Sequence, residues 1–250
     1  MPEMFRKLRR NRRSFMKLCM TAVTASQLRH TLAWSDSSTR SYNRVSLVGS
    51  NGHPLKSNDL EVGRNYVFHY PYVSTPCFLI DVGESLDHAV ELRQEDGQGY
   101  TWNGGVGQKK SIVAFSAICA HKMTHPAKSV SFIDYRHEII KYRDTGRNLA
   151  AGEKLIYCCS EQSVYDAKRG AMVLGGPASQ PLTAIALEYD ENRGRLSAVG
   201  TRGGEMYDQF FRKFRSRLQL EYGITDIGAL VQGKTEVMLL ENFSQTRVSC

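Results

Sequence analysis

Short runs of β-branched and aromatic residues recur along the chain, and clusters of turn-forming residues separate them. Such side chains favour extended backbone, whereas Asn, Asp, Gly and Pro interrupt it. The runs that read as strands are Asn65–Tyr70, Cys77–Val82, Ile112–Ile118, Val130–Tyr135, Lys154–Cys158, Thr183–Glu188 and Arg195–Gly200. Because no repeat and no linker divides this part of the chain, the sequence predicts one antiparallel all-β domain.

In residues 204–222 the apolar residues recur with a different spacing. Within 204–222, apolar residues recur every four positions at Met206, Phe210, Phe214 and Leu218, and basic residues occupy much of the remaining surface. This spacing predicts an amphipathic helix. Docking of its apolar face against the sheet is the simpler interpretation, and a membrane-surface or partner-binding helix is the alternative.

Two cysteine-containing segments follow predicted strands. The first includes Cys119 and His121, and the second includes Cys158 and Glu161. A cysteine and a histidine two positions apart can both bind a metal centre from one loop, and a second such loop completes the site. One Cys-x-His pair alone is weak evidence. A Gly- and Pro-rich run over 170–182, a short distance beyond the second segment, makes the pattern more specific.

Together these segments resemble the Rieske iron–sulfur family, whose members have the loops Cys-x-His-x-x-Cys and Cys-x-Cys-His-Gly-Ser-x-Tyr/Phe-Asp. Cys119 and His121 match the first ligand pair, and Cys158 matches the second-loop cysteine. Ser163 and Tyr165 are in register with family residues beyond the last ligand. The resemblance implies a single [2Fe–2S] cluster and one-electron transfer rather than bond-making chemistry on a substrate.

The run Gly176-Pro177-Ala178 through Pro181-Leu182 matches the proline segment that folds over the cluster in this family. The resemblance spans roughly residues 55–200 and is nearest to the cytochrome bc-type and arsenite-oxidase-small-subunit-like branch. It implies a Rieske-like antiparallel β-sandwich with a small cluster-binding subdomain at about 115–182. Gly176 and Pro177 would then cover the cluster, and the hydroxyls of Ser163 and Tyr165 would donate hydrogen bonds to its sulfur atoms.

The sequence departs from the family at three places. Glu161 stands where the second ligand histidine is expected, and Thr124 and Ser160 replace the two cysteines that form a disulfide between the loops of the quinol-oxidising branch. The 36 residues between His121 and Cys158 are about twice the family's usual spacing. Val130–Tyr135 is expected to form an extra strand or hairpin within this longer segment.

Three interpretations of Glu161 remain open. Its carboxylate can replace the imidazole as an iron ligand, which would lower the potential below the −150 to +300 mV, roughly, of centres with two histidines. Alternatively, His125 or Cys159 supplies the fourth ligand, and His125 is the better candidate because adjacent cysteines seldom reach the same iron. Finally, the fold can persist as a structural subunit that has lost its cluster. We favour Glu161, because it keeps the Cys-x-x-ligand spacing from Cys158.

The other cysteines have less distinctive surroundings. Cys77 lies in an apolar run and is expected to be a small core residue. Six cysteines in an exported protein would permit disulfides, but their spacing does not suggest a disulfide framework.

The N-terminus has the layout of an export signal. Residues 1–17 hold seven basic residues and one acidic residue, so the remainder of the chain carries only +2 of the total net charge of +8. This distribution argues against nucleic-acid binding. Arg12-Arg13-Ser14-Phe15-Met16-Lys17 followed by a short apolar run resembles twin-arginine signals. That run, about 11 residues, is shorter than the roughly 20 that span a bilayer, so it is either cleaved or a marginal anchor.

These observations predict three parts: a signal or anchor at 1–34, a Rieske domain at 41–203, and a helix-and-strand extension at 204–250. The expected function is that of an electron-transfer subunit of a periplasmic or membrane-associated oxidoreductase. Its partner would be a cytochrome or a larger oxidoreductase subunit. Quinol is an alternative donor, although Glu161 replaces the histidine that the family uses toward quinol.

Overall fold

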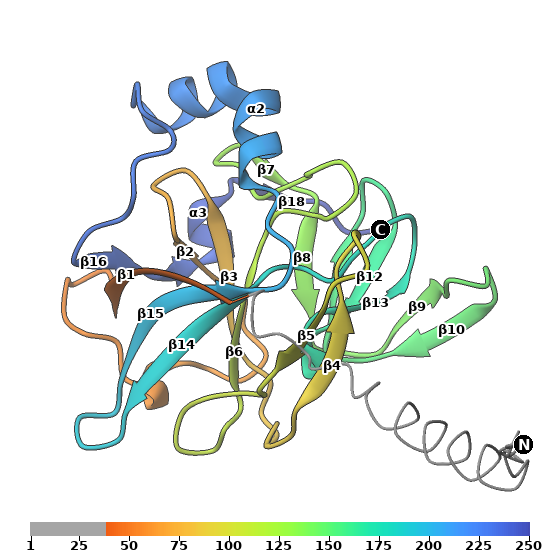
Figure 1. The fold of residues 1–250 in the computed structure, drawn as a ribbon, viewed down its shortest axis with the longest axis horizontal. Helices are drawn as coiled ribbons and strands as arrows, with labels where there is room; N and C mark the ends of the chain where they lie inside the picture. The colour runs from red at the N-terminus through yellow and green to blue at the C-terminus, as the bar shows by residue number, and fades with distance from the viewer. Residues whose placement is uncertain (1–38) are drawn as a thin grey trace, which may run out of the picture. The chain divides into compact units, whose positions relative to one another are not determined.

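The computed structural model describes residues 39–250, so the predicted signal at 1–34 lies outside the described residues. Most of the regular secondary structure in the described chain is β-strand (Figure 1). The strands are β1 (Thr39–Val48), β2 (Tyr66–His69), β3 (Pro76–Asp81), β4 (Val90–Arg93), β5 (Gly99–Trp102), β6 (Ile112–Ser116), β7 (Val130–Ser131), β8 (Ile133–Arg136), β9 (Ile140–Arg143), β10 (Leu149–Gly152), β11 (Leu155–Cys158), β12 (Ser163–Asp166), β13 (Met172–Gly175), β14 (Ala184–Asp190), β15 (Arg195–Arg202), β16 (Lys234–Glu236), β17 (Met238–Leu239) and β18 (Thr246–Arg247). The helices are α2 (Tyr207–Tyr222) and α3 (Leu240–Phe243), with single 3₁₀ turns at Ser57–Asp59 and Ala167–Arg169.

The strands form one large and one small sheet, joined by three two-stranded pairs. The large sheet has the order β16-β1-β15-β14-β6-β3-β2-β17, and the small sheet has the order β13-β12-β11-β8. Pairing is antiparallel throughout both sheets except between β1 and β16. The prediction of an all-β architecture with one amphipathic helix is confirmed, and each of the predicted strand runs contains a strand.

Strand β3 shows how the large sheet builds the core. All six of its residues are buried, because both faces of the sheet are covered at this position. Phe78 and Ile80 point into the core between the two sheets, together with Ile156 and Tyr165 of the small sheet. The alternate residue Cys77 faces a second core on the opposite side, as expected for a small apolar side chain. The two sheets are therefore held together by a shared apolar layer.

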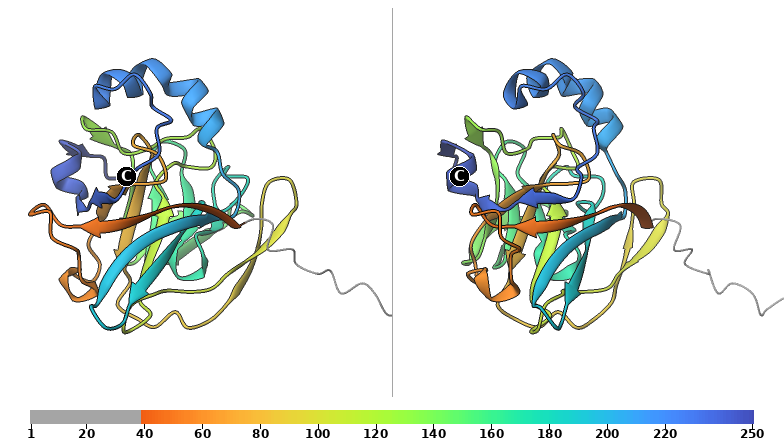
Figure 2. Two further views of the ribbon diagram at one scale, coloured as in Figure 1. Left: turned by 60° about the vertical axis from the view of Figure 1, so that its left-hand side comes forward. Right: turned by 90° about the vertical axis from the view of Figure 1, so that its left-hand side faces the viewer.

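Helix α2 lies across one end of the strands (Figure 2). Its Tyr207, Phe210 and Leu218 pack with Ile118 and Met123, which lie in the segment that follows β6. The helix thus docks by its apolar face, as the four-residue period predicted. No helix among the described residues is long and apolar enough to cross a membrane.

The region after residue 204 is joined closely to the large sheet. Strand β16 pairs with β1, and β17 pairs with β2, so this region supplies both edge strands. The longer segment between the two cysteine loops contains β7, β8 and a hairpin of β9 and β10. Strand β8 completes the small sheet by pairing with β11, which explains why this segment is long.

Candidate functional site

The first loop leaves β6 and turns back on itself. The Cys119 amide donates to the Thr124 carbonyl at 2.8 Å, and the Met123 amide donates to the Cys119 carbonyl at 3.0 Å. Met123 adopts a left-handed conformation with φ of 61°, which allows the tight reversal. As a result Cys119 is fully buried, while His121 lies at the outer rim of the loop with 29% of its side chain exposed.

The second loop is a four-residue turn of the small sheet. Strands β11 and β12 pair up to Cys158 opposite Ser163, and the intervening residues 159–162 form the turn. Gln162 takes a left-handed conformation that closes it, with φ of 57°. Cys158 is buried at the base of this turn, whereas Glu161 is carried to its outer side with 22% of its side chain exposed.

The two buried cysteines meet beside a tyrosine hydroxyl. Tyr165 Oη lies 3.2 Å from Cys119 Sγ and also accepts the Ala120 amide at 3.0 Å. Because the hydroxyl accepts from the amide, its own proton is available to the sulfur. The Ser163 hydroxyl is buried close by and contributes to the lowered pKa of the Cys119 thiol, yet it has no hydrogen-bond partner at normal distance among the described residues.

The pKa values of the two thiols are shifted in opposite directions. A hydrogen bond from Cys158 lowers the pKa of Cys119 to about 6, and the Tyr165 hydroxyl acts in the same direction against the effect of burial. The same hydrogen bond and burial raise the pKa of Cys158. One thiolate is therefore stabilised inside the protein, and thiolates are the form of cysteine that binds iron.

An imidazole and a carboxylate face each other from the two loops. His121 Nδ1 lies 3.6 Å from Glu161 Oε2, beyond hydrogen-bonding distance. This nitrogen is buried and has no hydrogen-bond partner among the described residues. The other carboxylate oxygen of Glu161 is 3.1 Å from Lys122 Nζ. The outer side of the site thus offers one nitrogen and one oxygen, and the inner side offers two sulfur atoms.

The glycine–proline run lies directly on the second loop. A Cβ atom on Gly176 would be 2.3 Å from the Gln162 carbonyl oxygen and 2.5 Å from Ser163 Cα. Gly176 also has φ of 78°, so both its conformation and its closeness to backbone require glycine. This contact places Pro177 at the rim of the site beside Glu161, where both line one pocket.

That pocket is an open hollow of about 510 Å³ between the site and the inserted hairpin. The turn of the β9–β10 hairpin forms one wall, and it is fixed to the proline run by the Thr145 amide, which donates to the Leu174 carbonyl at 3.1 Å. The lining residues are Arg143, Asp144, Thr145, Arg147, Glu161, Gln162, Gly176 and Pro177. The insertion therefore shapes the surface next to Glu161.

The two alternative fourth ligands lie elsewhere. His125 packs edge-on against Phe210 and Phe214 of α2, with ring centroids 4.8 and 4.9 Å apart. Its Nδ1 is 2.9 Å from the Met123 carbonyl, and burial lowers its pKa to about 4. Cys159 forms a disulfide with Cys250 and has no free thiolate. The eight residues predicted to ligate or surround the cluster all contribute to one site, and these two alternatives are engaged with other parts of the chain.

The disulfide corrects one expectation. The cysteine spacing did not suggest a disulfide framework, and Cys159 was considered only as a ligand, but Cys159 and Cys250 are joined across a sequence separation of 91 residues. Their proximity depends on tertiary structure, because the tail pairs with β7 far from it in sequence. The even number of cysteines, together with the expected export signal, was the one available hint.

The donor set suits a binuclear cluster. Within residues 39–250, no group of three or more His, Cys, Asp or Glu side chains converges to hold one ion. A [2Fe–2S] cluster of the Rieske type instead takes two ligands on each iron, as two separate pairs. The buried Cys119–Cys158 pair, the unpartnered His121 Nδ1 facing Glu161, and the unpartnered Ser163 hydroxyl fit this requirement.

No family model matches the chain. Among solved structures, the chain is similar to the soluble domain of the Rieske protein II (soxF) from Sulfolobus acidocaldarius. The sequences are 25% identical, the match covers 66% of this chain and 82% of that chain, and the TM-score is 0.44.

Proposed function

We propose that the protein transfers single electrons through a [2Fe–2S] cluster held by Cys119 and Cys158 on one side and by His121 and Glu161 on the other. The observation that supports this most directly is the buried sulfur pair beside the Tyr165 hydroxyl, with an unpartnered imidazole nitrogen facing a carboxylate. When bound, the cluster would supply one-electron redox chemistry, and the protein would set its potential and its access to partners.

Tyr165 and Glu161 would shift the redox potential of the cluster in opposite directions. The Tyr165 hydroxyl donates toward sulfur, which favours the reduced form and raises the potential. The Glu161 carboxylate adds negative charge at a position where the Rieske family has a neutral imidazole. This added charge favours the oxidised form of the cluster. Lys122 partly offsets that charge from 3.1 Å, although its side chain is 58% exposed and the ion pair is screened by water.

Glu161 is the preferred fourth ligand because the alternatives have other roles. His125 is wedged between two phenylalanines with its Nδ1 directed at a carbonyl, and Cys159 is in a disulfide. Moving His125 to the site would leave a gap under α2, with a cost of about 2–5 kcal/mol for a buried side chain of this size. Glu161 already lies at the site, opposite His121, with its side chain partly exposed.

The exposed edge of the site favours a partner with an acidic surface. Lys122 contacts Glu161, Lys213 Nζ donates to the Lys122 carbonyl at 2.8 Å, and Arg143 and Arg147 line the adjoining pocket. Residues 39–250 carry a net charge of only +2, so the proposed attraction is local to this edge, where Asp144 and Glu161 also line the pocket. Complementary charge would speed the encounter with an acidic redox protein, at a rate that falls with salt.

A structural subunit without a cluster is the second candidate. It is favoured by two contacts that form without a cluster, the interaction of the Cys158 and Cys119 thiols and the ion pair of Lys122 with Glu161. In this alternative the two loops would serve only to complete the small sheet and its interface with a partner.

Iron and acid-labile sulfide analysis of anaerobically purified protein tests the two candidates. We expect about two irons and two sulfides per chain, with an EPR signal after reduction. Glu161→His should retain the cluster and raise its potential, by about 60 mV for each 1.4 kcal/mol of relative stabilisation of the reduced form. His125→Leu is the matched control and should leave the spectrum unchanged. Protein that contains no iron after anaerobic reconstitution would favour the structural subunit.

Export through the twin-arginine route is a separate proposal, because Arg12 and Arg13 lie outside the described residues. Replacing both by lysine keeps the charge but removes the paired guanidinium groups. We expect precursor to accumulate in the cytoplasm, as measured by cell fractionation. Normal periplasmic levels of the double variant would contradict this assignment.

A further inference from the structure

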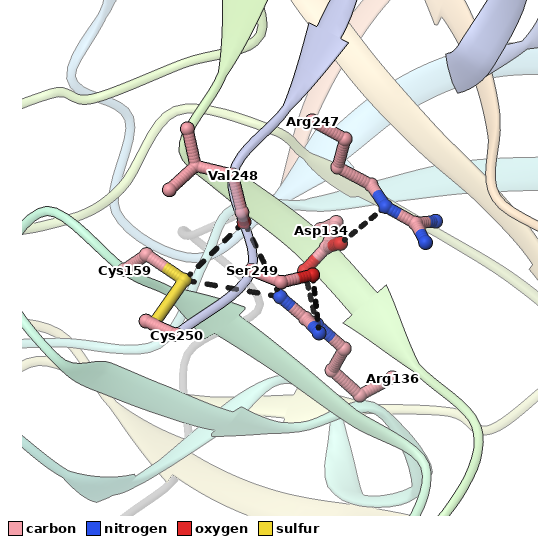
Figure 3. The surroundings of a disulfide bond; sticks show 7 residues. All are labelled: Asp134, Arg136, Cys159, Arg247, Val248, Ser249 and Cys250. Atoms are coloured by element: carbon pink, nitrogen blue, oxygen red, sulfur yellow. Dashed lines mark hydrogen bonds and ion pairs between the residues drawn. A yellow bond between two sulfur atoms is a disulfide. The ribbon is translucent and has the colours of Figure 1, made fainter.

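A disulfide joins the second loop to the end of the described chain. Cys159 is bonded to Cys250, and it directly follows the proposed ligand Cys158 (Figure 3). The Cys159 amide also donates to the Phe132 carbonyl at 2.7 Å, next to β8. The turn that carries Glu161 is therefore tethered at its first residue.

The segment that receives this tether is itself fixed to the domain. The Gln245 amide donates to the Lys128 carbonyl at 2.8 Å, and the Val248 amide donates to the Ser131 carbonyl at 2.9 Å. Between them β18 runs parallel to β7. Residues 244–250, here called the strap, thus lie along the segment that connects the first loop to the small sheet.

A buried carboxylate joins the strap to the small sheet. Asp134 of β8 is 2% exposed at its side chain and contacts Arg136 Nε at 2.6 Å and Arg247 Nε at 3.3 Å. Arg136 in turn donates to the Val248 carbonyl at 3.4 Å and lies 3.8 Å from Cys159 Sγ. Figure 3 shows these groups gathered around the disulfide. A buried carboxylate is stabilised by its guanidinium partners, because its charge is removed from water, so weakening these ion pairs is costly.

We propose that the strap is a covalent positioning element that holds the second loop in its ligating conformation. This inference rests on the proposed function. The quinol-oxidising branch of the Rieske family ties its two loops together by a disulfide, whereas Thr124 and Ser160 exclude that bond here. Cys159 is adjacent to Ser160, and its bond with Cys250 anchors the second loop to the body of the domain instead. The first loop is held separately, by α2.

Formation of the strap bond is a two-electron oxidation. The Cys159 and Cys250 thiols each lose a proton and together lose two electrons to a protein disulfide, which is reduced to two thiols. The bond therefore forms in an oxidising compartment and opens under strong reductant. With the bond open, the second loop loses its covalent link to the strap and keeps only non-covalent contacts, such as the Cys159 amide to the Phe132 carbonyl. Its turn is then expected to open more often.

Hydrogen exchange on the protein without cluster tests the strap directly. In Cys250→Ser, amides within 158–163 should exchange about tenfold faster than in the wild type, while amides of β14 and β15 keep their rates. Wild-type protein treated with tris(carboxyethyl)phosphine should behave like Cys250→Ser, and the reductant should not change the variant further. Val45→Ala, in the core on the opposite side of the large sheet, is the control for general destabilisation.

Cluster release gives the second readout. On loaded protein, Cys250→Ser should lose iron to a chelator several-fold faster than wild type and show shifted EPR g-values, whereas Val45→Ala should show neither change. Unchanged exchange at 158–163 in both Cys250→Ser and reduced wild type would overturn the proposal. Equal acceleration in all strands would also overturn it, since the bond would then stabilise the whole domain only. Absence of iron would instead count against the proposed function and leave the exchange result interpretable.

Discussion

Replacing Tyr165 by phenylalanine removes one oxygen atom from the centre of the site. The hydroxyl accepts the Ala120 amide at 3.0 Å and lies 3.2 Å from Cys119 Sγ. The ring itself is fully buried in the core between the sheets, where phenylalanine fills nearly the same space. The substitution therefore tests the two hydrogen bonds with little change in packing.

The expected effect on potential follows from the hydrogen bond to sulfur. A hydrogen bond to a charged acceptor contributes about 1.5–3 kcal/mol. The reduced cluster would place more negative charge on sulfur, so the hydrogen bond would stabilise it more than the oxidised cluster. If about half of the hydrogen-bond energy distinguishes the two redox states, the reduced state gains about 1 kcal/mol over the oxidised state. Since about 1.4 kcal/mol corresponds to about 60 mV for one electron, the potential should fall by about 40 mV.

The expected effect on stability follows from the Ala120 amide. This amide would remain buried without an acceptor, at a cost of about 1–3 kcal/mol. For a domain of this size, about 2 kcal/mol corresponds to a decrease in Tm of about 4–8 °C. The loss should occur in protein without cluster as well, because the amide is orphaned in either form.

Protein-film voltammetry and thermal unfolding measure the two effects. Tyr135→Phe is the matched control, because Tyr135 is equally buried in the same core but its hydroxyl contacts His137 Nδ1 at 3.0 Å instead of sulfur. The control should lose stability and keep its potential. An unchanged or higher potential in Tyr165→Phe would refute the assigned hydrogen bond to Cys119.

Two further substitutions test the surroundings of the site. Gly176→Ala should lower the free energy of unfolding in urea by about 2 kcal/mol or more, because the new Cβ would meet the backbone of the second loop. The control Gly97→Ala should cost only about 1 kcal/mol, because Gly97 has a similar φ but open space around it. His125 has a pKa lowered by burial to about 4, so between pH 6.5 and 4 the unfolded state binds a proton that the folded state does not, and stability falls as the pH is lowered. His125→Leu should remove up to about 3 kcal/mol of this loss, as measured by urea unfolding at pH 7 and pH 4. A pH dependence identical to that of the wild type would show that His125 is not a buried neutral group.

The sequence pattern predicted those strands whose apolar side chains are buried in the core. The runs that became β3 and β6 are apolar at every position or nearly so, because both faces are covered. Strand β1 was missed because its first half is polar, and its pairing with β15 depends on residues distant in sequence. The β9–β10 hairpin was missed for a similar reason, since the exposed faces of a short hairpin need few apolar residues.

The candidate site could be predicted because its chemistry is local. Cys119 and His121 come from one turn, and Cys158 and Glu161 come from another, so spacing alone carries most of the information. Helix α2 begins at Tyr207 rather than Gly204 because Glu205 is engaged by the sheet, where Tyr42 and Thr201 donate to its carboxylate. That contact, like the bond from Cys159 to Cys250, joins segments far apart in the chain and leaves no periodic trace in the sequence.

The sequence separation between paired strands differs in the two sheets, and this difference has a consequence for the order of folding. Every strand of the small sheet lies within 133–175, so its contacts close short loops. The large sheet, by contrast, pairs Thr39 with Arg202 and Ser46 with Lys234. Because closing long loops slows folding, we expect the small sheet and its second loop to gain protection first in pulse-labelled refolding, before β1 docks. The second loop, which carries two of the proposed cluster ligands, would then be shaped while the larger part of the protein is still assembling.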